Sequence, residues 1–407
     1  MDPVASRLFV CYVPGFDRRR INAERTPFVE QLLATGPAVG IETLLGTDHL
    51  PTIITGASPH EHRTWQVSLR PQARIPRRPR LTDRIPGVVS TTLQSLRHLV
   101  DRSYHLPTLP SHRRRQFDIH RAGFAGTGRG ARAPESIGGY ATVFGVIADS
   151  RFLFTRRLEH LEALADTLPS AQSALEVLEI HALDLIQHWH MDSPDRLGHA
   201  YRAVDAFLRE LRVRCEQRGV TLMLLADHGQ EPVLGTIPLI TQLQSLRVAE
   251  TDYSYFCELT LARFWFHTEE ARARLTHLLR EVPRTRMLSL KELRGMHILF
   301  EDDGYGELFL TADPGWIFFP NDHYHPLNSL VLGLIDRDQR PRLFNPRHRG
   351  AHGYLPEHPC EHGFAIVADP RFRARRPSAE LIDVAPTLLA LMGEVPPSYM
   401  RGRPVFG

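Results

Sequence analysis

Short apolar segments that alternate with helical segments constrain the fold of this chain most strongly. Residues 8–13 and 220–226 are nearly unbroken apolar runs, which are typical of strands buried in a parallel sheet. Residues 175–186 have the same character, and residues 39–45 form a further strand-like stretch. A helical pattern opens at Thr26-Pro27. Strands that alternate with helices predict an α/β fold with a mostly parallel central sheet and helices on both faces.

Two segments interrupt this alternation and predict insertions. Residues 65–140 are basic and rich in proline, which indicates an inserted cap with loops. Residues 231–340 combine strand-like segments with one clear helical pattern, which indicates an α+β subdomain. We therefore expect an α/β core built from residues 1–64, 141–230 and 341–407.

Composition excludes several classes of protein. The 49 basic residues nearly balance the 46 acidic ones, giving a net charge of +3, far from the large positive excess of a general nucleic-acid coat protein. No apolar run reaches the roughly 20 residues of a membrane span, and the N-terminus lacks the pattern of a signal peptide. The 4 cysteines are scattered, without a Cys-x-x-Cys pair. We therefore expect a cytoplasmic protein that uses neither a membrane nor nucleic acid as a partner.

Acidic residues and histidines lie just beyond the predicted strands. In an open α/β sheet, ligands bind at the carboxyl edge of the strands, so these side chains are candidates for one site. Their mixture of carboxylate and imidazole groups suits Zn²⁺ or Mn²⁺ better than Ca²⁺. The candidate metal ligands are Asp17, Asp195, His199, Asp227, His228 and His352. Each fragment alone has an ordinary structural explanation, such as a helix cap or a turn.

The motifs in their order resemble the alkaline phosphatase superfamily, specifically its type I phosphodiesterase/nucleotide pyrophosphatase branch. The matching pieces are Asp17 followed by TPFVEQL, then TIITGASPHEH, PDRLGH, LLADHGQ, AHGYLP and finally IDVAPTLLALMG. They extend over nearly the whole chain, although the two predicted insertions carry little of the resemblance. The resemblance implies an alkaline-phosphatase-like fold with two insertions.

The resemblance also implies a centre with two divalent metal ions. Asp17, Asp227 and His228 would hold one ion, and Asp195, His199 and His352 would hold the other. Two cations can neutralise a phosphoryl group and stabilise both the attacking and the leaving oxygen. We expect zinc, with manganese as the alternative.

The nucleophile is where the sequence departs from the family pattern. The family places a Thr, Ser or Cys nine residues before the position of Thr55, and here that position is Gly46. Thr47 is adjacent and would serve as the nucleophile if the loop were one residue shorter. The alternatives are a metal-activated water and a site that binds without turnover. His49 would contact a phosphate oxygen, supply acid–base catalysis or cap the following helix.

We therefore predict a metal-dependent phosphohydrolase that cleaves a phosphodiester or pyrophosphate bond in a small phosphorylated substrate, with nucleotides among the candidates. The alternatives are a catalytically inactive phosphate- or nucleotide-binding member and a phosphomonoesterase or phosphomutase of the same fold. Two further histidines, His188 and His190, flank Trp189 ahead of Asp195 and either face the site or lie at the surface near it. The sequence does not decide the oligomeric state.

Overall fold

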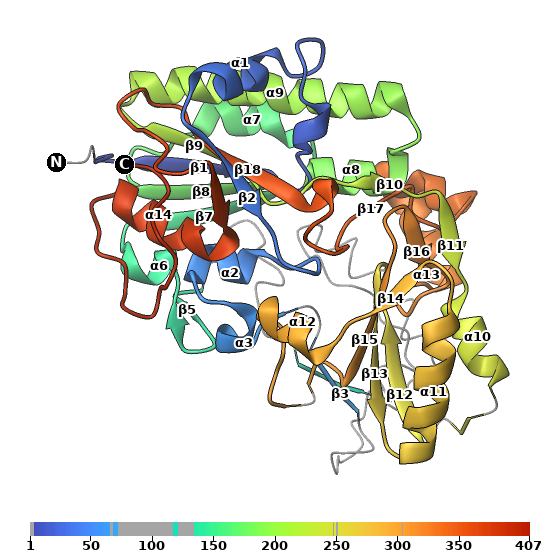
Figure 1. The fold of residues 1–407 in the computed structure, drawn as a ribbon. Coiled ribbons are helices and arrows are strands. Elements are labelled where there is room, and N and C mark those ends of the chain that lie inside the picture. The colour runs from blue at the N-terminus through green and yellow to red at the C-terminus, as the bar shows by residue number, and fades with distance from the viewer. Residues whose placement is uncertain are drawn as a thin grey trace, which may run out of the picture.

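A seven-stranded sheet forms the centre of the molecule (Figure 1). The computed structural model describes residues 4–65, 68–71, 117–120, 134–246, 248–249, 251–302 and 304–407. The strand order is β19-β2-β18-β9-β1-β8-β7. The strands are β1 (Leu8–Tyr12), β2 (Ala38–Glu42), β7 (Ser150–Thr155), β8 (Leu175–Ile180), β9 (Thr221–Ala226), β18 (His362–Val367) and β19 (Ser378–Glu380).

The sheet is mostly parallel, as predicted. Strand β1 lies between β8 and β9 and is parallel to both, while β18 is antiparallel to its neighbours β2 and β9. Alternate residues of β1 enter two separate cores, because successive side chains of a strand point to opposite faces. Leu8, Val10 and Tyr12 belong to one core, whereas Phe9 and Cys11 belong to the other. The strands are therefore covered on both faces, which explains their unbroken apolar character.

Helices cover both faces of the sheet (Figure 1). One face packs against α1 (Pro27–Thr35), α7 (His160–Thr167), α8 (Ala182–His190) and α9 (Pro194–Gln217). The other face packs against α2 (Leu50–Thr55), α6 (Val143–Val146) and α14 (Val384–Leu391). Asp205 of α9 accepts hydrogen bonds from the first free backbone N–H groups of α1, at Phe28 and Val29, and so fixes the start of that helix.

A second sheet lies within residues 231–340 and has its own apolar core. Its antiparallel strand order is β12-β13-β15-β14. The elements are β12 (Tyr253–Cys257), β13 (Leu261–Phe266), α11 (Glu269–Glu281), β14 (Thr285–Met287), α12 (Leu290–Gly295) and β15 (Leu308–Ala312). Around it lie β11 (Gly235–Ile237), α10 (Leu239–Ser245), β16 (Trp316–Phe318) and α13 (Pro326–Ile335).

The remaining elements are short. The β-segments pair as β3 (Ser68–Pro71) with β4 (Phe117–His120), β5 (Ser136–Ile137) with β6 (Tyr140–Ala141), and β10 (Glu231–Pro232) with β17 (Gly350–Ala351). The short helices are α3 (Pro59–His62), η1 (Arg18–Arg20), η4 (Arg337–Leu343), η5 (Pro359–Glu361) and η6 (Leu381–Asp383).

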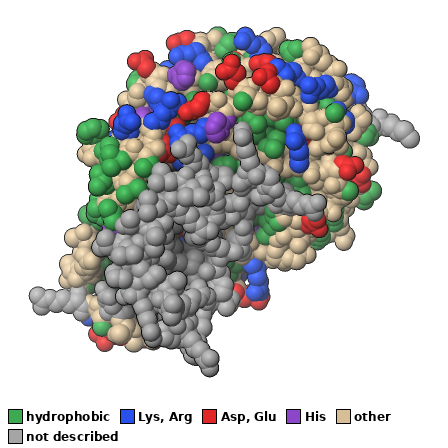
Figure 2. All heavy atoms as spheres, turned by 180° about the vertical axis from the view of Figure 1, so that it is seen from behind, with side chains coloured by type: hydrophobic (Ala, Val, Ile, Leu, Met, Phe, Trp, Pro, Cys, Tyr) green, Lys and Arg blue, Asp and Glu red, His purple; other side chains and the backbone are tan. Residues whose placement is uncertain are grey.

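The predicted insertion at residues 65–140 lies mostly outside the described residues, and the boundaries proposed for it and for residues 231–340 stay predictions. One predicted element differs clearly. The strand expected over residues 175–186 ends at Ile180, and α8 begins at Ala182. Acidic and basic side chains are interspersed on the described surface in Figure 2. Within the described residues, no helix combines the length and hydropathy that a membrane crossing requires.

Candidate metal centre

Two groups of metal-ligating side chains meet beyond the carboxyl ends of β8 and β9. Asp184 and His188 lie on α8, and His352 follows β17; their ligand atoms lie within 4.8 Å of one another. Asp227 and His228 directly follow β9, and His49 precedes α2. These last three residues form the second group, again within 4.8 Å. We call the two sets the Asp184 group and the Asp227 group.

The two groups are adjacent. The rings of His228 and His352, one from each group, stack with centroids 3.8 Å apart and an interplanar angle of 10°. The ring of His188 also lies against His352, with centroids 5.2 Å apart. The ring of His49 lies against His228, with centroids 5.5 Å apart. The four imidazoles and two carboxylates therefore form one continuous site at the sheet edge.

The Asp184 group has the geometry of side chains that share a cation. The Nε2 atom of His188 lies 3.5 Å from one carboxylate oxygen of Asp184, and Nε2 of His352 lies 3.6 Å from the other. Hydrogen bonds are normally near 2.9 Å, whereas ligands about 2.0 Å from a tetrahedral Zn²⁺ lie about 3.3 Å apart. One carboxylate with two imidazoles, leaving a coordination position open, is typical of catalytic zinc sites.

Neighbouring groups orient these ligands. His188 directs Nδ1 to the backbone carbonyl of Gly350 at 2.9 Å, so its Nε2 faces Asp184. Gln230 is fully buried, and its side-chain amide donates to Asp184 Oδ1 at 2.6 Å and to the Asp184 carbonyl at 3.0 Å. Contacts of this kind fix the ring orientation and the carboxylate of a metal site. His352 Nδ1 is buried and has no hydrogen-bond partner among the described residues.

The charge states suit cation binding. Burial alone would raise the pKa of Asp184, but the surrounding histidines, first His188 and then His352, outweigh it and hold that pKa well below its ordinary value. Burial and the neighbouring His228 hold the pKa of His352 well below its ordinary value. Asp184 is therefore ionised and His352 neutral, which are the forms that bind a metal.

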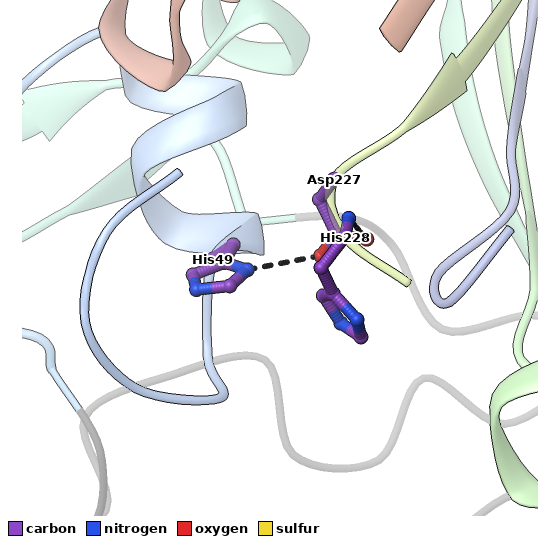
Figure 3. A group of neighbouring side chains, drawn as sticks. All are labelled: His49, Asp227 and His228. Carbon is purple, nitrogen blue, oxygen red and sulfur yellow. Dashed lines mark hydrogen bonds and ion pairs between the residues drawn. The ribbon is translucent and has the colours of Figure 1, made fainter. Parts of the chain in front are cut away.

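The Asp227 group has a different geometry, drawn in Figure 3. Oδ2 of Asp227 accepts a hydrogen bond from the Tyr12 hydroxyl at 2.6 Å and lies 3.1 Å from His49 Nδ1. Oδ1 accepts the backbone N–H of His228 at 3.1 Å. Burial opposes ionisation of Asp227, but His228, His49 and Tyr12 together hold its pKa well below the ordinary value. Burial would also lower the pKa of His49, but its contact with Asp227 outweighs burial and raises it.

The structure brings four of the predicted site residues together, namely His49, Asp227, His228 and His352. Asp17 is buried nearby, but its carboxylate accepts hydrogen bonds from the backbone and guanidinium of Arg19 and lies 3.6 Å from Arg20 Nε. It belongs to neither group. Arg19 and Arg20, two and three residues further along the chain, therefore satisfy the charge of Asp17.

Asp195 and His199 lie apart from the two groups. Both are exposed on the first turns of α9 and belong to neither group. Asp184 and His188 on α8 have the same spacing of four residues, and they are the pair that lies beside His352. The structure therefore does not bring Asp195 and His199 together with His352, whereas α8, which begins at the end of β8, brings Asp184 and His188 there.

Thr47 is exposed and lies against the loop that carries His352. A Cβ atom placed on Gly353 would lie 3.0 Å from Thr47 Cγ2. Gly46, which precedes it, has a positive φ of 115°, a conformation that favours glycine. Next to Thr47, burial raises the pKa of Asp48 to about 6, although the neighbouring His49 acts in the opposite direction.

Sequence reasoning missed Asp184 and left open whether His188 faces the site or lies at the surface. The available signal was an Asp and a His one helical turn apart directly after a buried strand. The apolar residues on either side of Asp184 concealed this signal, because Ala182, Leu183, Leu185 and Ile186 continue the pattern of the strand. A third group that the sequence did not suggest contains Glu231, His358 and Cys360. In that group the Glu231 carboxylate already pairs with Arg19 at 2.8 Å.

The fold and this site define an α/β protein with a candidate metal centre at the carboxyl edge of its sheet. A sequence model of the type I phosphodiesterase / nucleotide pyrophosphatase family matches residues 13–355. The chain therefore belongs to that family and is a phosphoric ester hydrolase by family membership. No curated protein sequence matches it significantly.

Solved structures support the fold. Murine ectonucleotide pyrophosphatase / phosphodiesterase 5 superposes with a TM-score of 0.60 and 14% sequence identity, over 96% of both chains. Its inactive threonine-to-alanine variant, in complex with AMP, also gives a TM-score of 0.60, with 15% identity and 96% coverage of both chains. These matches agree with the alkaline-phosphatase-like fold predicted from the sequence.

Proposed function

We propose that this chain is a zinc-dependent hydrolase that cleaves a phosphodiester or pyrophosphate bond, with nucleotides as the preferred class of substrate. The observation that carries the proposal is the Asp184 group, which offers one ionised carboxylate and two imidazoles at shared-cation distances beside a second buried acid. Membership of the phosphodiesterase family supports the reaction type. The AMP complex of the murine relative supports a nucleotide. Manganese remains the alternative metal.

In this proposal Asp184, His188 and His352 hold the cation. When bound, the cation neutralises a phosphate oxygen and stabilises charge that develops during displacement. Gln230 and the Gly350 carbonyl keep the ligands oriented, so little reorganisation is needed when substrate arrives.

Thr47 is the proposed nucleophile. Its hydroxyl would form a bond to phosphorus as the bond to the leaving group breaks, and water would then release the phosphoryl group from the threonine. The position of Thr47 against the His352 loop supports this role. His49, two residues further along the chain, is placed to hold or move a proton through its contact with Asp227. Direct attack by water is the alternative.

The experiment that tests this proposal compares release of p-nitrophenol from bis-p-nitrophenyl phosphate and from p-nitrophenyl phosphate, with protein loaded with Zn²⁺ or Mn²⁺. We expect faster release from the diester. The Thr47→Ala variant should lose this activity while it retains metal, and retained activity would assign the attack to water. A protein that contains metal yet hydrolyses neither ester, nor any nucleotide diester, would contradict the proposal.

A second function, phosphate or nucleotide binding without turnover, is favoured by one specific observation. Gly46 stands where the family has its nucleophile. This alternative would be supported if the metal-loaded protein bound nucleotides but hydrolysed none of them. A cytoplasmic location also stays a prediction, which rests on the scattered cysteines.

A further inference from the structure

We infer that this chain carries a single divalent ion, in the Asp184 group, and that the hydrogen-bonded pair His49–Asp227 occupies the position predicted for a second ion. The inference starts from the metal-dependent chemistry proposed above. It concerns the number of ions, which can be measured without a substrate.

Asp227 Oδ2, the oxygen that His228 Nε2 approaches, already accepts two hydrogen bonds. It accepts from Tyr12 at 2.6 Å and from His49 at 3.1 Å, which together engage both lone pairs of that oxygen. His228 Nε2 lies 3.5 Å from this same oxygen, so an ion shared by Asp227 and His228 would have to bind where these donors are. The distances from Asp227 to Tyr12 and His49 are hydrogen-bond distances. In the Asp227 group only His228 lies at a separation like the 3.5 and 3.6 Å of the Asp184 group.

The nitrogens of His49 are used as well. Nδ1 faces the Asp227 carboxylate, and Nε2 faces the backbone carbonyl of Leu44 at 3.1 Å. Both of these oxygens only accept hydrogen bonds, so both ring nitrogens serve as donors. The Thr43 hydroxyl, which lies 3.4 Å from each ring nitrogen, can accept as well. A donor nitrogen has no lone pair for a metal ion. His49 is only 3% exposed, and α2, which follows it, is buried at every position, so the ring has little space to turn.

No other carboxylate of the predicted set completes the second position. Asp17, predicted as the third ligand with Asp227 and His228, is engaged by Arg19 and Arg20. Binding of a second ion at Asp227 Oδ2 would therefore require this oxygen to give up its hydrogen bonds to Tyr12 and His49. Within the Asp227 group, the ion would gain only His228 as a further ligand. The residues present fit one ion and do not fit two.

The test is the number of zinc ions bound per full-length chain. Protein loaded with excess Zn²⁺ and dialysed against buffer is assayed by elemental analysis, and its affinity is measured by competition with a chromogenic chelator. We expect one tightly bound ion in the unmodified chain. Two ions per chain of comparable affinity would overturn the inference, and this measurement needs no variant.

Two matched variants locate the ion. Asp184→Asn should reduce the bound zinc to a small fraction, whereas Asp227→Asn should leave one ion per chain with an affinity within about threefold of the original. Loss of the ion in folded Asp227→Asn, or its retention in Asp184→Asn, would contradict the inference. Circular dichroism identifies any variant that fails to fold. If Asp227→Asn does not fold, Tyr12→Phe is used in its place. We expect Tyr12→Phe to retain one ion per chain, and loss of that ion would contradict the inference.

Failure of this inference is distinguishable from failure of the proposed function. A chain with one ion that hydrolyses no ester would contradict the proposed function alone. A chain with two ions that hydrolyses diesters would contradict only the inference.

Discussion

Replacing Gln230 with alanine should weaken metal binding without removing a ligand. Gln230 is fully buried and donates two hydrogen bonds to Asp184, one to Oδ1 and one to the backbone carbonyl. Without them the Asp184 carboxylate is free to rotate away from His188 and His352. Loss of such an orienting partner typically lowers metal affinity about 10- to 100-fold, or about 1.4–2.8 kcal/mol.

The same change has a calculable effect on stability. At a free Zn²⁺ concentration 100 times the original dissociation constant, bound metal stabilises the protein by about 2.7 kcal/mol. A tenfold weaker site would contribute about 1.4 kcal/mol under that condition, and a 100-fold weaker site about 0.4 kcal/mol. The gain in unfolding free energy on adding zinc should therefore shrink by more than about 1 kcal/mol in Gln230→Ala.

Chelator competition and denaturant unfolding with and without zinc measure these two effects. Gln172→Ala is the matched control, because Gln172 is exposed and lies outside both groups. A folded Gln230→Ala protein with unchanged zinc affinity would refute the reasoning that Gln230 orients Asp184.

Three further substitutions test an ion pair and the backbone packing elsewhere in the molecule. Burial opposes ionisation of Asp336, but Arg156 and Arg157 outweigh it and lower its pKa. Asp336→Asn should therefore destabilise the protein by about 2 kcal/mol at pH 7, and this difference should narrow as the pH falls below about 4 and through the folded-state pKa. Urea unfolding of Asp336→Asn and of the unmodified protein measures this difference in unfolding free energy, and a difference that does not change with pH would contradict this account. Gly363→Ala places a Cβ 2.1 Å from a backbone carbonyl oxygen of β9. We therefore expect the free energy of unfolding to fall by about 1–3 kcal/mol or more. At Gly295, in α12, an added Cβ would have no atom within 4 Å. Gly295→Ala should therefore raise the free energy of unfolding by about 0.5–1 kcal/mol. Equal shifts of the melting temperature in Gly363→Ala and Gly295→Ala would contradict the steric argument.

Sequence patterns predicted the central sheet well, because its strands are buried on both faces and lack polar interruptions. The run before Asp227 corresponds to β9, which begins at Thr221 and ends at Ala226. His228 and His352 were recognisable because each lies in a short polar motif directly beyond a strand or in a glycine-rich loop. Such motifs are local, so the sequence alone contains their signal.

Other parts of the site depend on where the chain turns, which local sequence does not specify. The residues on either side of Asp184 are apolar because α8 packs against the sheet, so they resembled a longer strand and concealed Asp184. Asp17 has the right position after the first strand, but the arginines that follow it take its charge. The contacts of Tyr12 and His49 with Asp227 join segments 178 to 215 residues apart in sequence, so only the folded structure shows them.

The central claim is that Asp184 and His188, not Asp195 and His199, hold the catalytic cation with His352. The most direct test is the zinc content of two double variants, Asp184→Asn/His188→Gln and Asp195→Asn/His199→Gln. Both pairs have the same residue types and the same spacing on a helix, so each variant is a control for the other. Our account predicts that the first double variant loses its zinc and the second retains it. Retention of zinc in the folded first variant, or its loss from the folded second variant, would contradict the account.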